Sequence, residues 1–373
     1  MKSETISRLA LSVIPRLGAV KAKELVTHYG SADTVFKMDE KQLLASNVNP
    51  NIAKNITDPT HRKLSFERAQ KELDFIEKKR IELIHFDGDT YPSHLQNCID
   101  SPFLLFKKGN TNLEARKTVA IVGTRNATSY GLGFTDLLVK HLAQHQVTVV
   151  SGLAYGIDGA AHKACLKYNT PTIGVLGHGL DMIYPTAHRK LAADMLENGS
   201  LLTEFMSETP SLPANFPKRN RIVAGMVDAV IVVEGAIKGG AMVTANLAHG
   251  YEKELFAVPG RSIDKYSQGC NYLIKTQRAL FLDDPEELAM ELGWEMFDLK
   301  KKFQKNDYNL DASLSETEKE VLKILLDKGG VSKENFCKTL KLSIGEISSI
   351  LFELELKDKI ISKPGNYFEI RML

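Results

Sequence analysis

The segment VAIVGTRNATSYG, residues 119–131, has the outline of a nucleotide-binding turn without its usual residues. A β-branched apolar run breaks at Gly123 and leads into a helical pattern, as in a strand-turn-helix that binds phosphate. The dinucleotide fingerprint requires glycines two and five positions after the first, where this sequence has Arg125 and Thr128. A guanidinium therefore stands where a pyrophosphate needs bare main chain, which argues against a dinucleotide-dependent oxidoreductase.

Other glycine-rich segments follow predicted strands in the same way. In SGLAYGIDGAAH (151–162), Ser151 and Gly152 form a tight turn before a helix that is expected to open near Ile157. EGAIKGGAMVTANLA (234–248) and Pro259-Gly260-Arg261 follow two further apolar runs. Free amides at the amino terminus of a helix bind anions, and ligands of open α/β sheets gather at the carboxyl ends of the strands. Together these loops indicate a phosphate site.

The segment PANFPKRNRIVAG (213–225) combines an aromatic residue with cations. Phe216 stands beside Lys218, Arg219 and Arg221 in a predicted loop between proline-rich turns and an apolar helix. This suits single-stranded nucleic acid because bases stack on rings and cations bind phosphates. The alternative is that Phe216 fills the core and the cations form a solvated start of a helix. Three cations oppose the helix dipole at that end, which favours an external anion.

Several functional classes are not supported by the sequence. It contains no GxxxxGK[ST], GxSxG or HExxH motif, and Asp158, His162 and Glu234 have no nucleophile with an orienting partner near them in sequence. The net charge is +2, and the four cysteines lack metal-ligand spacing, so we expect reduced thiols and no metal. No apolar stretch has the length of a signal peptide or of a membrane span, which predicts a soluble cytoplasmic protein without a membrane partner.

Apolar runs that alternate with amphipathic segments predict the scaffold for these loops. Continuous apolar runs are typical of strands buried on both faces of a parallel sheet, so the fold is expected to be α/β, a Rossmann-like doubly wound, mostly parallel sheet. A further strand is expected at IELIHF, after an amphipathic helix at 64–79. The central strands are predicted at 103–106, 119–122, 147–150, 172–176, 200–203, 229–233 and 255–258.

The two ends of the chain read as separate domains. The first is a helical domain at 1–60, whose turn from Pro15 to Gly18 suggests either a helix-hairpin-helix that receives a DNA phosphate or a plain helical hairpin. The last has three helical patterns and a hairpin, which predicts a winged helix, and Ser315 with Glu318 forms a capping box. The expected organisation is a helical domain at 1–60, a Rossmann-like domain at 61–298, a linker at 299–313 and a winged helix at 314–373.

In this order, VGTRNATSYG, VSGLAYGIDGAAH, GVLGHGLDMIYP, LLTEF, NFPKRNRIVAG, VVEGAIKGGAMVTANLA, AVPG and GCNYLI resemble the DNA-processing protein A (DprA, or Smf) family of natural transformation. The resemblance implies a homodimer that binds single-stranded DNA, loads the RecA recombinase, and has neither cofactor nor catalytic turnover. A polynucleotide presents separate phosphates, each suited to a bidentate guanidinium such as Arg125. The implied DNA-binding residues are Gly123, Thr124, Arg125, Ser151, Gly152, Phe216, Lys218, Arg219, Asn220, Arg221, Gly239, Gly240 and Thr244.

The main alternative is an enzyme, a nucleotide-processing hydrolase similar to the lysine-decarboxylase-like phosphoribohydrolases. Against it, EGAIKGGAMVTANLA lacks the PGGxGTxxE pattern and its glutamate.

The predicted winged helix differs from winged helices that bind duplex DNA. Its third helical segment, 343–357, has Glu346, Glu353 and Glu355 and no cation before Lys357, whereas a recognition helix normally offers Arg, Lys, Asn or Gln to the groove. We therefore expect this domain to dock on protein. In that arrangement its apolar set would form the core and its acidic edge would face a basic partner. The apolar set is Ile347, Ile350, Leu351 and Leu354.

Overall fold

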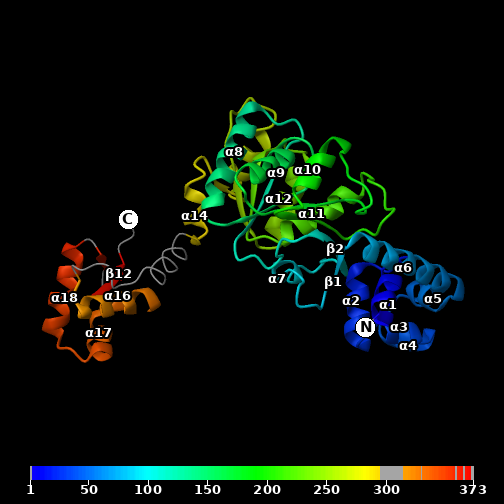
Figure 1. The fold of residues 1–373 in the computed structure, drawn as a ribbon, viewed down its shortest axis with the longest axis horizontal. Coiled ribbons are helices and arrows are strands. Elements are labelled where there is room, and N and C mark those ends of the chain that lie inside the picture. The colour runs from blue at the N-terminus through cyan, green and yellow to red at the C-terminus, as the bar shows by residue number, and fades with distance from the viewer. Residues whose placement is uncertain (1, 295–313, 329, 358, 364–365, 371–373) are drawn as a thin grey trace. The chain divides into compact units, whose positions relative to one another are not determined.

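The computed structural model describes residues 2–294, 314–328, 330–357, 359–363 and 366–370 (Figure 1). Its contacts divide the chain into two compact units, Met1–Leu288 and Ala289–Leu373. The linker predicted at 299–313 lies outside the described residues.

A large sheet forms the centre of the first unit, and its strands follow the order β1-β2-β6-β5-β4-β3-β7-β8-β9. Strands β3 to β9 run parallel, whereas β2 pairs antiparallel with β6 and β1 pairs antiparallel with β2. This confirms the predicted mostly parallel, doubly wound sheet. The strands are β1 (Glu82–His85), β2 (Leu104–Gly109), β3 (Thr118–Gly123), β4 (Thr148–Ser151), β5 (Thr172–Val175), β6 (Gly199–Thr203), β7 (Ala229–Glu234), β8 (Glu254–Ala257) and β9 (Leu280–Phe281).

Helices cover both faces of this sheet (Figure 1). On one face α8 (Ser129–Gln144) packs beside α9 (Ile157–Lys167). On the other face α11 (Asn215–Gly225) packs beside α12 (Gly240–Gly250). The core on this second face also includes residues of α7 (Ser93–Gln96) and α13 (Gln268–Lys275). A smaller apolar cluster includes residues of α10 (Arg189–Asp194), which follows the 3-10 turn η1 (Thr186–His188).

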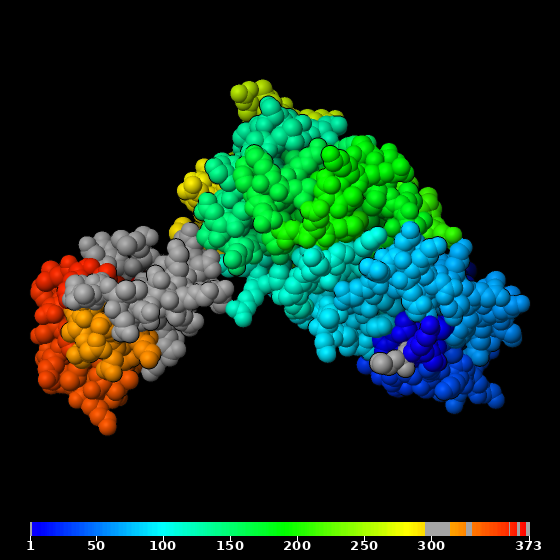
Figure 2. Space-filling model, viewed as in Figure 1, coloured from blue at the N-terminus to red at the C-terminus, as the bar shows by residue number. Residues whose placement is uncertain are grey.

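The amino-terminal helices share one core with the edge of the sheet. Leu104 and Phe106 of β2 and Met206 belong to the same buried apolar cluster as Leu9, Val35 and other residues of these helices. Figure 2 shows this blue segment packed against the cyan part of the same unit. The helices are α1 (Lys2–Ser12), α2 (Ala19–Tyr29), α3 (Ala32–Lys37), α4 (Glu40–Ala45), α5 (Pro50–Thr57) and α6 (Pro59–Lys79), and α6 packs on α1.

The Pro15–Gly18 turn lies against the sheet. A cavity of 240 Å³ is lined by Leu17 and Gly18 on one side and by Phe103 and Glu204 on the other. Lys23 Nζ donates to Ser101 Oγ at 2.6 Å and ties α2 to the same region. This placement favours the plain helical hairpin, packed on its neighbour, over a turn that is free to receive DNA.

The second unit has the helices and hairpin predicted for a winged helix. The capping box forms, since Glu318 N donates to Ser315 Oγ at 3.2 Å and Ser315 N donates to Glu318 Oε2 at 2.6 Å. The small sheet has the order β10-β12-β11. Its elements are α14 (Glu287–Glu291), which spans the unit boundary, α16 (Glu316–Lys328), β10 (Val331–Ser332), α17 (Lys333–Leu340), α18 (Ile344–Leu356), β11 (Ile360–Lys363) and β12 (Tyr367–Ile370).

All four cysteines are free thiols, as the sequence predicts, and three of them are buried. Burial raises the pKa of Cys165 and of Cys270 to about 12, which keeps both thiols protonated and unreactive. Among the helices of the described residues, none has both the length and the apolar character needed to cross a membrane.

Candidate functional site

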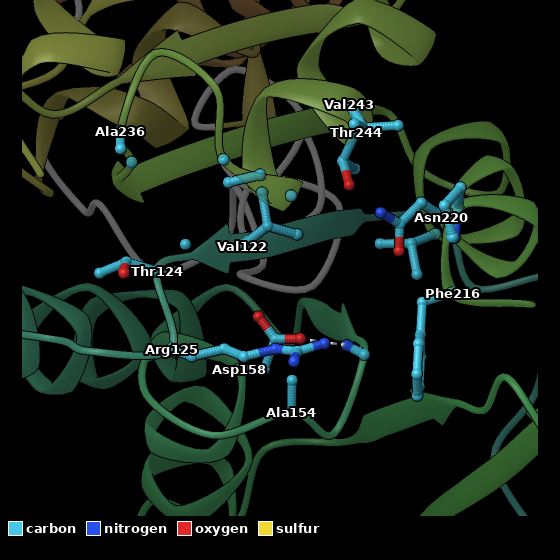
Figure 3. Close-up of a pocket in the computed structure, with 18 of the residues that line it drawn as sticks. Val122, Thr124, Arg125, Ala154, Asp158, Phe216, Asn220, Ala236, Val243 and Thr244 are labelled. Carbon is cyan, nitrogen blue, oxygen red and sulfur yellow. Dashed lines mark hydrogen bonds between the residues drawn. The ribbon is translucent and has the colours of Figure 1, made fainter. Parts of the chain in front are cut away.

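A pocket of 390 Å³ opens at the carboxyl ends of the strands, where β3 lies between β4 and β7. The chain winds from β3 through β4 to one side and from β7 through β8 to the other, so this is the switch point where α/β sheets bind ligands. Figure 3 shows the residues around it, with Arg125, Asp158, Phe216 and Thr244 contributed by separate elements. We call it the strand-end pocket.

The turn after β3 is fixed by the end of β7. Thr124 N donates to the Glu234 carbonyl at 2.7 Å. Thr128 caps α8, and its N–H and hydroxyl donate to the two carboxylate oxygens of Glu234 at 2.9 and 2.5 Å. The position where a dinucleotide fold has its third glycine therefore holds a structural hydroxyl, which fixes the path of the Arg125 loop.

Two glycines leave the room that the pocket requires. Gly156 has φ +74°, and a Cβ there would lie 2.1 Å from the Thr124 carbonyl oxygen. A Cβ on Gly152 would lie 2.0 Å from Nη1 of Arg219. Gly156 also precedes α9 without a side-chain cap, as predicted, and Gly239 precedes α12 in the same way. At α9 the Ile157 N–H already donates to the Thr124 carbonyl at 3.2 Å. The start of α12, where Gly239 and Gly240 line the pocket, is therefore the helix end that is open to a ligand.

Arg219 places a buried guanidinium in the wall of the pocket. It is 4% exposed, and Nη1 donates to the Val175 carbonyl at 2.5 Å, while Nε is buried without a hydrogen-bond partner. Asp158, at 7% exposed, is the one carboxylate among the described lining residues. Burial raises the pKa of Asp158 and the positive charge of Arg219 opposes that rise. The unpaired Nε of Arg219 and the positive charge of its guanidinium favour an anion at this wall of the pocket.

Arg125 and Phe216 form the outer edge of the same pocket. The guanidinium carbon of Arg125 lies 5.5 Å from the centre of the Phe216 ring. Tyr184 lies on Phe216 as well, with ring centroids 5.9 Å apart. Arg125 is exposed. Burial has the largest effect on the pKa of Arg219 and lowers it, the Asp158 carboxylate raises it, and the charge of Arg125 lowers it again. Two guanidinium groups thus face one pocket beside an aromatic ring.

The structure brings most of the predicted DNA-binding residues together. The predicted residues that line the strand-end pocket are Gly123, Thr124, Arg125, Gly152, Phe216, Arg219, Asn220, Gly239, Gly240 and Thr244. Ser151, Lys218 and Arg221 do not line it. The Ser151 hydroxyl is fully buried and donates to the Ile121 carbonyl at 2.6 Å.

Residues 215–225 form the helix α11 rather than the loop that the sequence suggested for the cationic segment. Pro217 is tolerated in its first turn because the amides there have no partner within the helix. Arg221 lies on a different side from Arg219 and binds the Glu204 carboxylate and the Asp100 carbonyl. Internal groups thus neutralise Arg221, so its charge gives no support for an external anion. Lys218 is exposed outside the pocket.

Sequence reasoning missed several residues that line the pocket. Tyr266 comes from the loop after β8, and Asp158 was considered only as an acid or base. Ala236 and Val243 flank the start of α12. Tyr266 follows Lys265 directly and lies near Arg261, a cationic and aromatic stretch that could have marked it. Asp158, Ala236 and Val243 have no such signal, apart from the glycine-rich turns that bring them together. No group of three or more His, Cys, Asp or Glu suited to a metal occurs among the described residues.

His162 is a structural residue, and its titration gives a test. Its Nδ1 lies 2.8 Å from the Thr172 hydroxyl, and burial is the main cause that lowers its pKa to about 3. The unfolded chain, with a pKa near 6.5, takes up this proton first, so stability falls as pH decreases from about 6.5. We expect this residue alone to cost about 2 kcal/mol between pH 7 and 5. Urea unfolding of wild type and His162→Gln at both pH values checks this, and parallel pH profiles would contradict it.

The chain is similar in sequence to one family over most of the first unit. The sequence pattern of the family described as DNA recombination-mediator protein A matches residues 82–293. Protein Smf of Escherichia coli (strain K12) is 36% identical over 313 residues, which cover 83% of this chain and 83% of that protein.

Solved structures show the same likeness. The X-ray structure of DNA processing protein A from Streptococcus pneumoniae superimposes with a TM-score of 0.62 at 29% identity, covering 77% of this chain and 96% of the other. DNA processing protein A from Helicobacter pylori, described for its mode of binding single-stranded DNA, has a TM-score of 0.53 at 30% identity. That match covers 59% of this chain and 97% of the other.

Proposed function

The chain belongs to the DNA recombination-mediator protein A family, and from this premise we propose that it binds single-stranded DNA and delivers it to the RecA recombinase during natural transformation, without catalytic turnover. The Helicobacter pylori relative, described for its single-stranded DNA binding, supports the ligand class.

One observation carries the proposal: the guanidinium groups of Arg125 and Arg219 converge on a pocket that has Asp158 as its one carboxylate among the described residues. Burial lowers the pKa of Arg219, Asp158 offsets part of that effect and the exposed Arg125 adds to it, so a further anion beside both guanidinium groups is favourable. The uncapped amino terminus of α12, at Gly239 and Gly240, lines the same pocket and attracts negative charge. A phosphate satisfies all of these groups.

The remaining lining residues suit a nucleotide within a single strand. Phe216 presents its ring beside the cations, and Asn220 and Thr244 offer polar groups for a base or sugar. A base has to leave its stack to lie on Phe216, which is easy in a single strand and costs a few kcal/mol in a duplex. We therefore expect duplex DNA to bind more weakly than a single strand.

The groups that an enzyme would need here are occupied by structural roles. The Ser151 hydroxyl donates to a backbone carbonyl, and the Glu234 carboxylate caps α8 through Thr128. His162 is fully buried. These contacts support binding without hydrolysis over the phosphoribohydrolase alternative.

Fluorescence anisotropy with labelled oligo-dT, a duplex of the same length, and a nucleoside monophosphate as competitor tests this function. We expect tight binding of the single strand, weaker duplex binding and little competition by the monophosphate. Incubation with ATP, nucleoside monophosphates and DNA is expected to leave all three intact. Turnover that is lost in Asp158→Asn would instead favour the enzyme alternative.

Dimer formation is part of the proposal, and the β9 edge of the sheet supports it. Leu280 and Phe281 are 46% and 53% exposed on this two-residue strand, which within the described part of the chain pairs with β8 alone. Exposed apolar edges are sites where chains associate. Phe281→Glu is expected to give monomers in analytical ultracentrifugation at micromolar concentration, whereas Lys190→Glu on α10 keeps the dimer. Unchanged sedimentation of Phe281→Glu would place the interface elsewhere.

Delivery to RecA rests on family membership, and it implies that the protein works in the cytoplasm. The measurement is RecA filament formation on single-stranded DNA covered by a single-strand-binding protein. We expect this protein to accelerate filament formation. An unchanged rate would contradict the RecA role and leave DNA binding untouched.

The winged helix is proposed to dock on protein rather than on DNA. Ile347, Leu351 and Leu354 form its buried core as predicted, while α18 exposes Phe352 and Leu356 at 61% and 69%. Removing residues 299–373 is expected to leave single-strand affinity within about threefold, because the acidic helix α18 repels DNA. The isolated segment 314–373 is expected to show negligible duplex binding in anisotropy. Low-micromolar duplex binding in physiological salt would overturn this.

A further inference from the structure

A second pocket adjoins the strand-end pocket on the far side of Tyr266. It has a volume of 890 Å³ and is lined by Thr128, Tyr130 and Glu234 together with the loop from Pro259 to Ser267, so we call it the loop pocket. Tyr266 lines both pockets, and Asn126 Nδ2 donates to its hydroxyl at 3.0 Å. The two pockets therefore meet at Tyr266.

The loop that forms this pocket is anchored at both ends. Asn271 holds Gly260 on two sides, since Gly260 N donates to Asn271 Oδ1 at 3.2 Å and Asn271 Nδ2 donates to the Gly260 carbonyl at 2.9 Å. At the other end Gly235 N donates to the Tyr266 carbonyl at 2.6 Å. Residues 261–265 between these anchors are all exposed. The anchors fix the loop in place and leave its middle to solvent.

The side chains around the loop pocket suit a phosphodiester. Arg261 and Lys265 are exposed and make no ion pair within the described residues, whereas Asp264 is the one exposed acid of the loop. Glu234 is 3% exposed, and both of its oxygens already accept from Thr128. The exposed charge is therefore cationic on balance.

An aromatic side chain completes the arrangement. The Tyr130 side chain is half exposed, and its hydroxyl donates to the Pro259 carbonyl at 3.0 Å, which orients the ring beside the loop. Cations next to an oriented ring are what single strands bind, the ring by stacking and the cations by phosphate contact.

We propose that the loop pocket binds the next nucleotides of the strand held in the strand-end pocket, with Arg261 and Lys265 on phosphates and Tyr130 against a base. This inference rests on the proposed function and adds a second subsite to it. The subsite contributes only when the strand is long enough to pass Tyr266.

The test is the dependence of affinity on oligonucleotide length. For Arg261→Ala/Lys265→Ala we expect dT4 to bind within twofold of wild type. Binding of dT12 is expected to weaken by about tenfold or more, with a salt slope lower by about 1.4, because two phosphate contacts are lost. Tyr130→Leu is expected to weaken the binding of dT12 more than that of dT4, because only the longer strand reaches the loop pocket and places a base on the Tyr130 ring. The matched control, Lys78→Ala/Lys79→Ala, removes the same charge from exposed positions of α6 and should leave both affinities within twofold.

The outcomes separate this inference from the proposed function. The loop subsite is wrong if the double variant binds dT12 no more weakly than the control does. It is also wrong if dT4 and dT12 lose affinity equally, since the loop would then belong to the strand-end pocket. Failure of wild type to bind either oligonucleotide overturns the proposed function itself.

Discussion

Arg125→Ala is expected to weaken single-strand binding by about 10- to 100-fold while the fold stays intact, since a charge-assisted contact contributes about 1.5–3 kcal/mol. Arg125 is exposed over the Phe216 ring, so its removal deletes a phosphate contact without opening the core. The salt slope of binding should fall by about 0.7 for one lost phosphate. Anisotropy titrations at several salt concentrations measure both quantities.

Two further variants serve as a comparison and a control for Arg125→Ala. Lys218→Ala, exposed on α11 beside the pocket, is expected to weaken binding less than Arg125→Ala does and to lower the salt slope by about 0.7 at most. Lys79→Ala, exposed on α6, is the matched control and should change neither quantity. Unchanged affinity and slope in both Arg125→Ala and Lys218→Ala would move the DNA site elsewhere on the molecule.

Glu72→Ala is expected to lower the free energy of unfolding by about 3 kcal/mol, because it removes a buried carboxylate that pairs with the partly exposed Arg68 and accepts from a buried amide. The Glu72 carboxylate is 1% exposed and accepts from Arg68 at 3.0 Å and from the Ser207 N–H at 3.0 and 3.1 Å. Its loss leaves the Arg68 charge uncompensated and the buried amide of Ser207 without its acceptor. Urea unfolding followed by circular dichroism measures the change.

The same helix offers the control for this prediction. Glu67 is exposed on α6, 4.0 Å from Lys63, and Glu67→Ala is expected to cost less than about 1 kcal/mol. Arg68→Ala/Glu72→Ala should recover part of the loss, because the unpaired charge is removed as well. Equal costs for Glu72→Ala and Glu67→Ala would mean that the contact of Glu72 with Ser207, which links α6 to the segment after β6, does not stabilise the fold.

The strands and turns were predictable because each is a local pattern. The apolar runs beginning at Val119 and Ala229 are buried on both faces, and their lengths and glycine ends mark them without reference to the rest of the chain. The order of strands is not local. No residue pattern in β2 indicates that this strand runs antiparallel to β6. The sequence therefore predicted the sheet, but not the antiparallel strands β1 and β2 at its edge.

The candidate site divides in the same way. Arg125 was identifiable because it replaces a glycine of a known fingerprint. The glycines of the turns were identifiable because each follows a predicted strand. Arg219 and Arg221 were taken together because the segment was read as a loop. On a helix, positions two apart point about 200° from each other, so both cannot reach one ligand. Tyr266 meets Asn126 from a loop 140 residues away, a distance in sequence that no local pattern covers.

The core shared between the amino-terminal helices and β2 has a consequence for synthesis of the chain. Leu9 and Val35 leave the ribosome early, but their partners Leu104, Phe106 and Met206 follow only 69 to 197 residues later. Until Met206 has emerged, the helices expose apolar surface that the finished protein buries. The first segment to be made is thus among the last to be covered, which makes the nascent chain a natural client for chaperones during translation.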